Sequence, residues 1–185
     1  MERHPLSPIT EAAGSFASGP EHANSLGMRF YYVPSEARVE CEWTPTDKVQ
    51  GWVGLAHGGA FAALHDDAAA FAMVLLACRT GFTTKMDIRF LKPMRLGQPI
   101  TATGKVQELS ERRGTFVTEI ASKAGDLLST ALTEYAFVDG KTLERLLGRP
   151  LSEPMKKWIG SDDAGRRAYA IEWGRTHGPA ASREP

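Results

Sequence analysis

The sequence predicts an α+β domain in which a curled antiparallel β-sheet wraps around one long central helix, with a C-terminal helical extension. The stretch Gln50–Cys78 starts as a glycine-rich loop and continues as nearly twenty mostly apolar residues. Two strand-like segments precede it, and four follow it with short turns between them. A helix that is apolar on all sides must be enclosed, and the flanking strands supply the enclosing sheet.

The central helix is expected from Gly58 to Cys78, and three polar residues interrupt it at its midpoint: His65, Asp66 and Asp67. Its length would allow a membrane span, but adjacent polar residues, two of them acidic, are costly in lipid. We therefore expect no membrane span. Carboxylates are rarely enclosed in protein without a partner or a purpose, so this acidic pair is a functional candidate.

Composition and the alternation of apolar and polar residues predict the structure of the segments before the helix. Residues 1–24 are rich in Pro, Ser, Gly, Ala and Glu, which predicts a flexible arm. Residues 28–33 form a short β-like run. In residues 37–44, apolar and charged side chains alternate with period two, which indicates a strand with one buried face.

The segments after the helix have strand character and are separated by turns. Gly81 is expected to end the helix as its C′ residue. The strands are predicted at residues 83–91, 99–109, 115–123 and 127–138. Short turns between successive strands favour an antiparallel meander.

The composition changes after Gly140. Short helices are expected at 142–147 and 155–159, and a longer one from a Ser161 cap to Trp173. The last ten residues are expected to be disordered. The chain is thus divided into a flexible arm, a main domain and an extension that packs on the domain or on a partner subunit; the boundaries are 1–24, 25–140 and 141–185.

Composition excludes several classes of protein. The chain has 22 basic and 22 acidic residues and no basic stripe with interleaved aromatics, so no nucleic-acid partner is expected. Its two cysteines form no CxxC pair, which suggests reduced structural thiols in a cytoplasmic protein. The N-terminus has no apolar core of a secretion signal.

The stretch QGWVGLAHGGAFAALHDD resembles the signature of PaaI-like hotdog-fold acyl-CoA thioesterases, roughly QG-x-x-G-x-x-HGG followed by six residues and an acid. HANSLGMRF (22–30) and TTKMDIRFLKPMRLG (83–97) are similar to two further parts of the family pattern. The resemblance covers residues 22–138. Ala23-Asn24-Ser25 departs from the usual Asn-Pro, and His65 stands where a small or aliphatic residue is usual.

The resemblance implies a hotdog fold and hydrolysis of an acyl-CoA or acyl-carrier-protein thioester, without a cofactor. The chemistry needs an activated water or nucleophile and donors for the oxyanion. Free backbone amides and the positive dipole end lie where the helix begins, at Gly58 and Gly59; the resemblance points to the first of the two glycines. Asp66 is the expected general base, or a nucleophile through a mixed anhydride.

The spacing of these residues predicts an oligomer. Asp66 follows His57 by nine residues, which is about 13 Å along a helix and on its opposite side. One carbonyl cannot touch both ends of one helix. We therefore expect a homodimer or tetramer with active sites at the subunit interface, where the acid of one chain faces the helix start of the other.

Some candidate residues have more than one possible role in the site. His57 is a general base, or it orients the loop or contacts substrate. Gln50 closes the loop or contacts the water or thioester. Thr83 helps to place the water, with Thr84 as the alternative if the strand register differs by one.

The remaining candidates surround the acid or carry charge. His65 alters the pocket or the pKa of the neighbouring acid, and Asp67 is a structural acid. Arg89, with Lys92 and Arg95, is a candidate contact for CoA phosphates. No metal is expected, because adjacent residues such as His65 and Asp66 do not share a helix face.

Two other functions compete with hydrolysis. One is a different hotdog enzyme, such as an acyl-thioester dehydratase, whose differently spaced His–acid motif is not found here. The other is a non-catalytic acyl-CoA-binding module, which would lack the acid or the water-placing hydroxyl. The identity of the acyl group, and CoA versus carrier protein, stay open.

Overall fold

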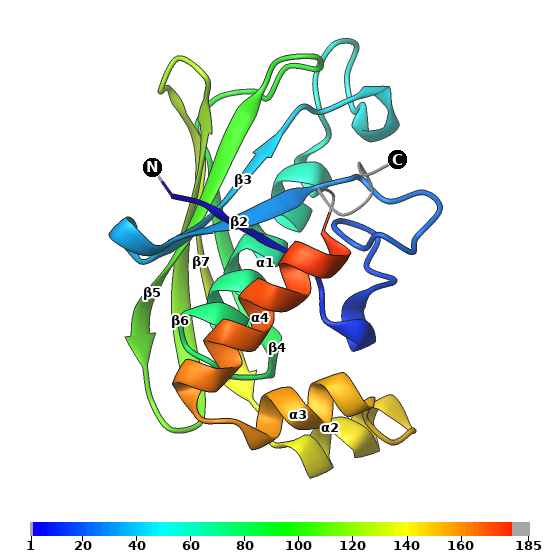
Figure 1. The fold of residues 1–185 in the computed structure, drawn as a ribbon. Helices are drawn as coiled ribbons and strands as arrows, with labels where there is room; N and C mark the ends of the chain where they lie inside the picture. The colour runs from blue at the N-terminus through cyan, green and yellow to red at the C-terminus, as the bar shows by residue number, and fades with distance from the viewer. Residues whose placement is uncertain (1, 179–185) are drawn as a thin grey trace.

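The computed structural model describes residues 2–178 as a sheet, a central helix and a helical layer (Figure 1). The strands are β1 (His4–Leu6), β2 (Arg29–Val33), β3 (Arg38–Trp43), β4 (Gly81–Phe90), β5 (Ile100–Leu109), β6 (Arg113–Ser122) and β7 (Leu127–Phe137). The helices are α1 (Gly58–Leu75), α2 (Gly140–Leu147), α3 (Glu153–Gly160) and α4 (Asp163–His177), with short 3-10 turns at Thr10–Ala12, Pro34–Glu36 and Asp47–Val49.

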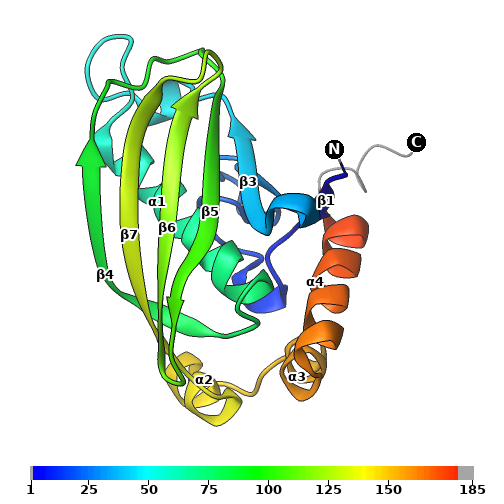
Figure 2. The same cartoon turned by 90° about the vertical axis from the view of Figure 1, so that its left-hand side faces the viewer.

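The sheet curls around α1, as the sequence predicts. Its strand order is β1-β2-β3-β5-β6-β7-β4, and every pairing is antiparallel. Figure 2 shows α1 lying in the concave side of this sheet. The helix can lie so close because Gly104 of β5 has no side chain; a Cβ there would be 2.6 Å from the Ala68 carbonyl oxygen.

The expected four-strand meander is wrong at its first strand. β5, β6 and β7 follow one another in the sheet, but β4 pairs with β7 and not with β5. The chain after β4 therefore passes the positions of β7 and β6 before β5 begins beside β3. This crossing leaves β4 as a terminal strand, with one edge unpaired within the described chain.

The central helix ends earlier than predicted, and Gly81 does not end it. The last helical residue is Leu75. Cys78 takes the left-handed conformation, with φ of 52°. Gly81 instead opens β4, where a Cβ would lie 2.5 Å from the Ala136 carbonyl oxygen. Close packing against β7 is thus the reason for a small residue at this position.

The N-terminal segment differs from the predicted flexible arm. His4–Leu6 forms the outermost strand and pairs with β2, and the side chains of Leu6, Ile9 and Ala17 are buried. The strand has three residues and includes Pro5, a combination that only an edge strand tolerates. Because so short a run has no alternation to read, the sequence did not reveal it.

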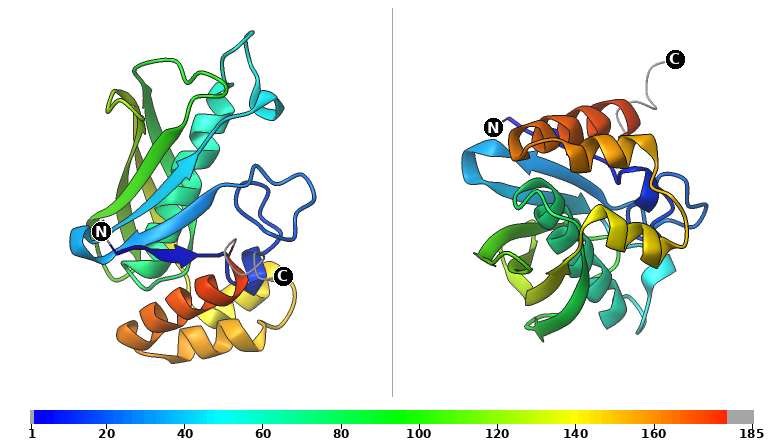
Figure 3. Two further views of the ribbon diagram at one scale, coloured as in Figure 1. Left: turned by 45° about the horizontal axis from the view of Figure 1, so that its top comes forward. Right: turned by 90° about the horizontal axis from the view of Figure 1, so that it is seen from below.

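The C-terminal extension packs on the domain. α4 lies across β1 (Figure 3) and reaches the C-terminal end of α1. There, Arg166 donates to the Cys78 carbonyl at 2.7 Å, and Arg167 donates to the Leu75 carbonyl at 3.2 Å. Arg167 thus satisfies a carbonyl group that the end of α1 leaves unpaired, and Arg166 binds a carbonyl of the turn that follows it.

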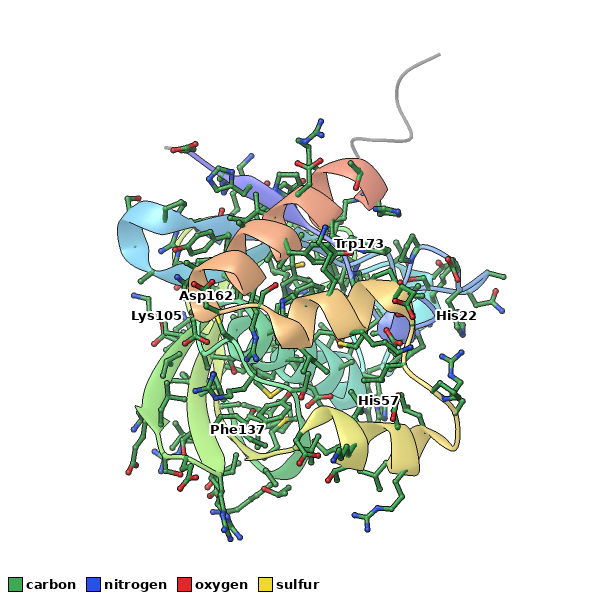
Figure 4. The ribbon with its side chains drawn as sticks, turned by 60° about the horizontal axis from the view of Figure 1, so that its bottom comes forward. His22, His57, Lys105, Phe137, Asp162 and Trp173 are labelled. Atoms are coloured by element: carbon green, nitrogen blue, oxygen red, sulfur yellow. The ribbon has the colours of Figure 1, made fainter. Side chains whose placement is uncertain are left out.

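The boundaries of α4 differ slightly from the prediction. Asp162, not Ser161, caps the helix by accepting from the Gly165 amide at 2.7 Å. Figure 4 shows Asp162 at the start of α4 and Trp173 near its other end. The Trp173 indole donates to the Pro8 carbonyl at 3.0 Å, which ties α4 to the N-terminal segment. The expected disordered end lies largely outside the described residues.

Gly174 is the point at which α4 contacts β1 backbone to backbone. A Cβ there would lie against the Pro5 carbonyl and 2.7 Å from Leu6 Cα. Gly174→Ala is therefore expected to lower the free energy of unfolding by about 2 kcal/mol, through overpacking. Urea unfolding measures this loss, and hydrogen exchange should rise in β1. The control is Gly160→Ala, because a Cβ at Gly160 meets no atom within 4 Å; equal losses in both variants would contradict the role of Gly174.

Candidate active site

The carboxylate of Asp66 lies halfway along α1 and meets strands β4 and β7. Its Oδ1 accepts hydrogen bonds from the Thr83 hydroxyl at 2.7 Å and from the Tyr135 hydroxyl at 3.2 Å. Within residues 2–178, Oδ2 accepts no hydrogen bond. One oxygen therefore anchors the carboxylate to the sheet, and the other is free to bind a water or a substrate atom.

Tyr135 is a component of this cluster that sequence reasoning missed. Its hydroxyl also donates to the main-chain carbonyl of Asp66, at 3.1 Å. Burial, together with the charge of Asp66, raises the pKa of Tyr135 well above its usual value. The hydroxyl therefore stays protonated and acts as a donor. Nothing in the sequence showed that Tyr135 would meet Asp66, because the polar residues Ser129 and Thr133 share the buried face of β7 with it and the strand shows no clear apolar alternation.

The two threonines at the start of β4 are distinguished by their contacts. Thr83 donates to the Asp66 carboxylate, whereas Thr84 donates to the Glu134 carbonyl at 3.1 Å. The register shifts between Thr83 and Lys85, so the strand is irregular at this point. The structure thus brings Thr83, and not its neighbour, to the acid.

The start of α1 presents one free amide. His57 precedes the helix, and its Nδ1 accepts a hydrogen bond of 2.9 Å from the Gly59 amide. The amide of Gly58 donates no hydrogen bond within the described chain. All three residues are exposed. Of the two expected oxyanion donors, Gly58 is therefore the available one, and His57 has the loop-orienting position rather than contact with Asp66.

The loop before the helix is held by its own hydrogen bonds. Gln50 Oε1 accepts from the Gly54 amide at 3.3 Å, and the His57 amide donates to the Val49 carbonyl at 2.8 Å. This is the loop-closing arrangement weighed for Gln50. Gly54 has φ of 75°, a conformation that glycine adopts without strain.

His65 lies away from this cluster. Its side chain is fully buried against the sheet, with Nδ1 2.7 Å from the Thr118 hydroxyl and Nε2 2.7 Å from the Ser129 hydroxyl. Burial lowers the pKa of His65 to about 4, so the ring is neutral at pH 7. Both ring nitrogens are thus occupied and no ring atom reaches the surface, so His65 faces the sheet and not the Asp66 carboxylate.

The other candidates are also separated from Asp66. Arg89 is exposed on β4, six residues after Thr83, which is about 20 Å along a strand. Asp67 faces the N-terminal segment, on another side of α1. Among residues 2–178, no group of three His, Cys, Asp or Glu side chains is placed to hold a metal ion. In that same part of the chain, no helix is long and apolar enough to cross a membrane.

The unpaired strand β4 joins the two ends of the candidate site. Thr83, at its start, contacts Asp66, and Phe90, at its end, lies beside Gly58 and packs edge-on against Phe61 at 5.4 Å between ring centroids. The strand thus runs antiparallel to α1. Large apolar side chains are exposed on β4 and just after it (Phe82, Phe90 and Leu91, at 44–57%) and on the neighbouring β7 (Leu132, 42%). In the glycine loop, Trp52 and Val53 are exposed at 82% and 94%.

A curled antiparallel sheet around one helix, with an acid on that helix bonded to strand hydroxyls, defines a hotdog-fold protein. The model of the thioesterase superfamily matches residues 53–129. A comparison with curated proteins gave no match.

Three solved structures illustrate the likeness. Thioesterase superfamily protein RHA08564 is 26% identical with a TM-score of 0.63; the match covers 67% of this chain and 60% of that protein's length. A Streptococcus pneumoniae TIGR4 hypothetical thioesterase with coenzyme A is 20% identical, with a TM-score of 0.53, over 55% of this chain and 81% of that one. The E. coli PaaI protein is 22% identical, with a TM-score of 0.51, and the match covers 54% of this chain and 75% of that one.

These matches confirm the resemblance that the glycine loop and its acid predicted. Residues 53–129 are similar to the thioesterase superfamily, and the hotdog fold is similar to that of PaaI. The helices α2, α3 and α4 lie after the matched segment, and β1, β2 and β3 lie before it.

Proposed function

We propose that the protein is a thioester hydrolase that acts on an acyl-CoA or acyl-carrier-protein substrate. The observation that carries this proposal is the Asp66 carboxylate, anchored through one oxygen by Thr83 and Tyr135 and open at the other. A carboxylate in this state can take a proton from water or attack a carbonyl carbon. The thioesterase-superfamily match and the CoA named with the S. pneumoniae structure support this class of substrate.

As a general base, Asp66 removes a proton from water while the water oxygen bonds to the thioester carbon. The carbonyl oxygen becomes an oxyanion, which needs a donor such as the Gly58 amide. Collapse of this intermediate breaks the carbon–sulfur bond, and the leaving thiolate takes the proton from Asp66. In the nucleophilic alternative, an Asp66 oxygen bonds to the acyl carbon and displaces the thiolate, which takes a proton from solvent. Water then hydrolyses the resulting anhydride, which releases the free acid and restores the Asp66 carboxylate.

One chain does not supply both groups to the same carbonyl. Gly58 and Asp66 are eight residues apart on α1, which is about 12 Å along the helix. If the free edges of two β4 strands pair antiparallel about a two-fold axis, the Thr83 end of one strand lies opposite the Phe90 end of the other. The acid of each chain then approaches the helix start of its partner. The exposed apolar side chains along β4 would be covered in such a dimer.

Mixing two inactive variants tests this arrangement. Asp66→Asn removes the base, and Gly58→Val covers the helix-start amide. Among the described residues, a Cβ at Gly58 meets only the Phe90 ring, at 3.7 Å. Each variant alone is expected to be inactive. In an equal mixture, half of the dimers are mixed and each has one intact site, so thiol release should return to about a quarter of the wild-type rate. A mixture as inactive as its components would contradict a shared site.

A panel of acyl-CoA and acyl-carrier-protein thioesters, assayed by thiol release, identifies the acyl class. No hydrolysis of any panel member, together with binding of CoA esters, would replace hydrolysis with the non-catalytic binding function. Size-exclusion chromatography with light scattering measures whether the protein is a dimer or a tetramer under the assay conditions.

A further inference from the structure

A cavity of about 140 Å³ lies on the side of α1 that does not face the sheet. One face of the helix contributes Asp67, Ala70, Phe71 and Val74, which follow the i, i+3, i+4, i+7 spacing of a single helix face. The N-terminal segment and the C-terminal helices close the other sides, through Leu6, Ile9, Met155 and Ala170 among others. The cavity is therefore built largely by parts of the chain that lie outside the matched thioesterase segment.

The lining is apolar apart from three serines and the Asp67 carboxylate. Asp67 Oδ2 is buried and has no hydrogen-bond partner within residues 2–178. No Lys, Arg or His lines the described walls of the cavity. A buried carboxylate oxygen without a donor is energetically costly, so the cavity offers an acceptor that its own walls do not satisfy.

The electrostatic environment agrees with this geometry. Burial raises the pKa of Asp67 to about 6; the nearby Ser18 opposes the rise, and the charge of Asp66 adds to it. At pH 7 most of this carboxyl is ionised, and no cation of the lining offsets its charge. A donor brought in by a ligand would stabilise it.

The cavity adjoins a second hollow, of about 360 Å³. The two share Leu6, Ser7, Pro8, Ser18 and Phe71, and the second extends past Arg29 and His177. A ligand would therefore enter from this side, between the N-terminal segment and the end of α4. A cavity of about 150 Å³ with apolar walls accommodates a benzene ring, which sets the size of a ligand.

We propose that this cavity is a second ligand site, which takes a compact apolar molecule whose single hydrogen-bond-donating head group pairs with Asp67. The site is separate from the proposed catalytic one, because the Asp66 carboxylate points to Thr83 and Tyr135 in the sheet while Asp67 faces Ser18. It goes beyond thioester hydrolysis and does not depend on it.

Three ring compounds of similar size test the proposal on the full-length protein: toluene, which has no donor, benzyl alcohol and benzylamine. Isothermal titration calorimetry at pH 7.5 should show saturable binding. The better of the two donor-bearing compounds should bind about tenfold more tightly than toluene, because toluene cannot donate a hydrogen bond to the charged Asp67 carboxylate. Whether the alcohol or the amine binds more tightly identifies the head group that the site prefers.

Two variants separate the cavity from the carboxylate. In Asp67→Ala the cavity remains but the acceptor is gone, so the preference over toluene should vanish. In Ala70→Leu the added side chain fills the space, so all three compounds should lose binding; Val74→Phe, one turn away, serves the same purpose if that variant does not fold. The absence of binding to the wild type, a donor preference that survives Asp67→Ala, or binding that survives in the filled variants would each overturn the proposal.

Discussion

Asp66→Asn is expected to lower kcat on the best thioester substrate by on the order of 10²–10⁴-fold, the usual contribution of a general base. Asparagine keeps the shape of the side chain, and its carbonyl oxygen can still accept from Thr83 and Tyr135. Only the second oxygen, which is free to act on water, is replaced by an amide group without basicity. The fold and the oligomeric state should therefore be preserved.

Single-turnover kinetics with excess enzyme measures this loss at the chemical step. Thr83→Ala should have a smaller effect, about tenfold, because it removes one of the two donors that position Asp66. Thr84→Ala is the matched control, since within residues 2–178 the Thr84 hydroxyl bonds only to the Glu134 carbonyl. A folded Asp66→Asn variant with activity near that of the wild type would refute the assignment and redirect attention to His57.

His65→Ala is expected to lower the free energy of unfolding by about 4 kcal/mol. The change leaves a cavity under the sheet and removes the partner of two buried hydroxyls, those of Thr118 and Ser129. Urea unfolding at a fixed protein concentration measures the loss. Thr118→Val and Ser129→Ala, combined with His65→Ala in double-mutant cycles, assign the coupling. Losses that simply add would show that the hydrogen bonds do not contribute.

The buried ring of His65 makes the free energy of unfolding of the wild type depend on pH. The pKa of His65 falls from 6.5 to about 4 on folding, so the unfolded chain binds a proton more readily. The neutral buried ring therefore contributes fully to the free energy of unfolding above pH 6.5. As the pH falls toward 4, the free energy of unfolding decreases by about 3 kcal/mol, because the unfolded chain takes up the proton. Asp67 acts in the opposite direction, because its pKa rises from 3.8 to about 6 on folding; its favourable contribution is full below pH 3.8 and is lost as the pH rises through 6.

The two buried groups therefore offset each other between pH 4 and 6 in the wild type. Asp67→Asn removes one of them, so its stability should fall more steeply than that of the wild type as the pH decreases from 6.5. Unfolding free energies at several pH values compare the two slopes. Equal slopes in the two proteins would contradict the pKa shift of Asp67.

The local pattern of the chain was sufficient for much of the fold. Period-two alternation predicted β3 and β4, and the apolar run after the glycine loop predicted α1. The resemblance of the HGG motif and its acid to the thioesterase signature predicted Asp66 as the residue that carries the chemistry, and the free amides at a helix start predicted the oxyanion donor. These inferences depend on neighbours in sequence.

Only the tertiary structure decided how distant segments meet. Whether Thr83 or Thr84 reaches Asp66 depends on an irregularity in the pairing of β4 with β7, and the contribution of Tyr135 depends on the same pairing. The burial of His65, and the cavity beside Asp67, depend on which face of α1 turns to the sheet and which turns to the chain termini. Sequence spacing predicts that adjacent helix residues point about 100° apart, but it does not show what each of them faces, because that is set by packing between elements far apart in the chain.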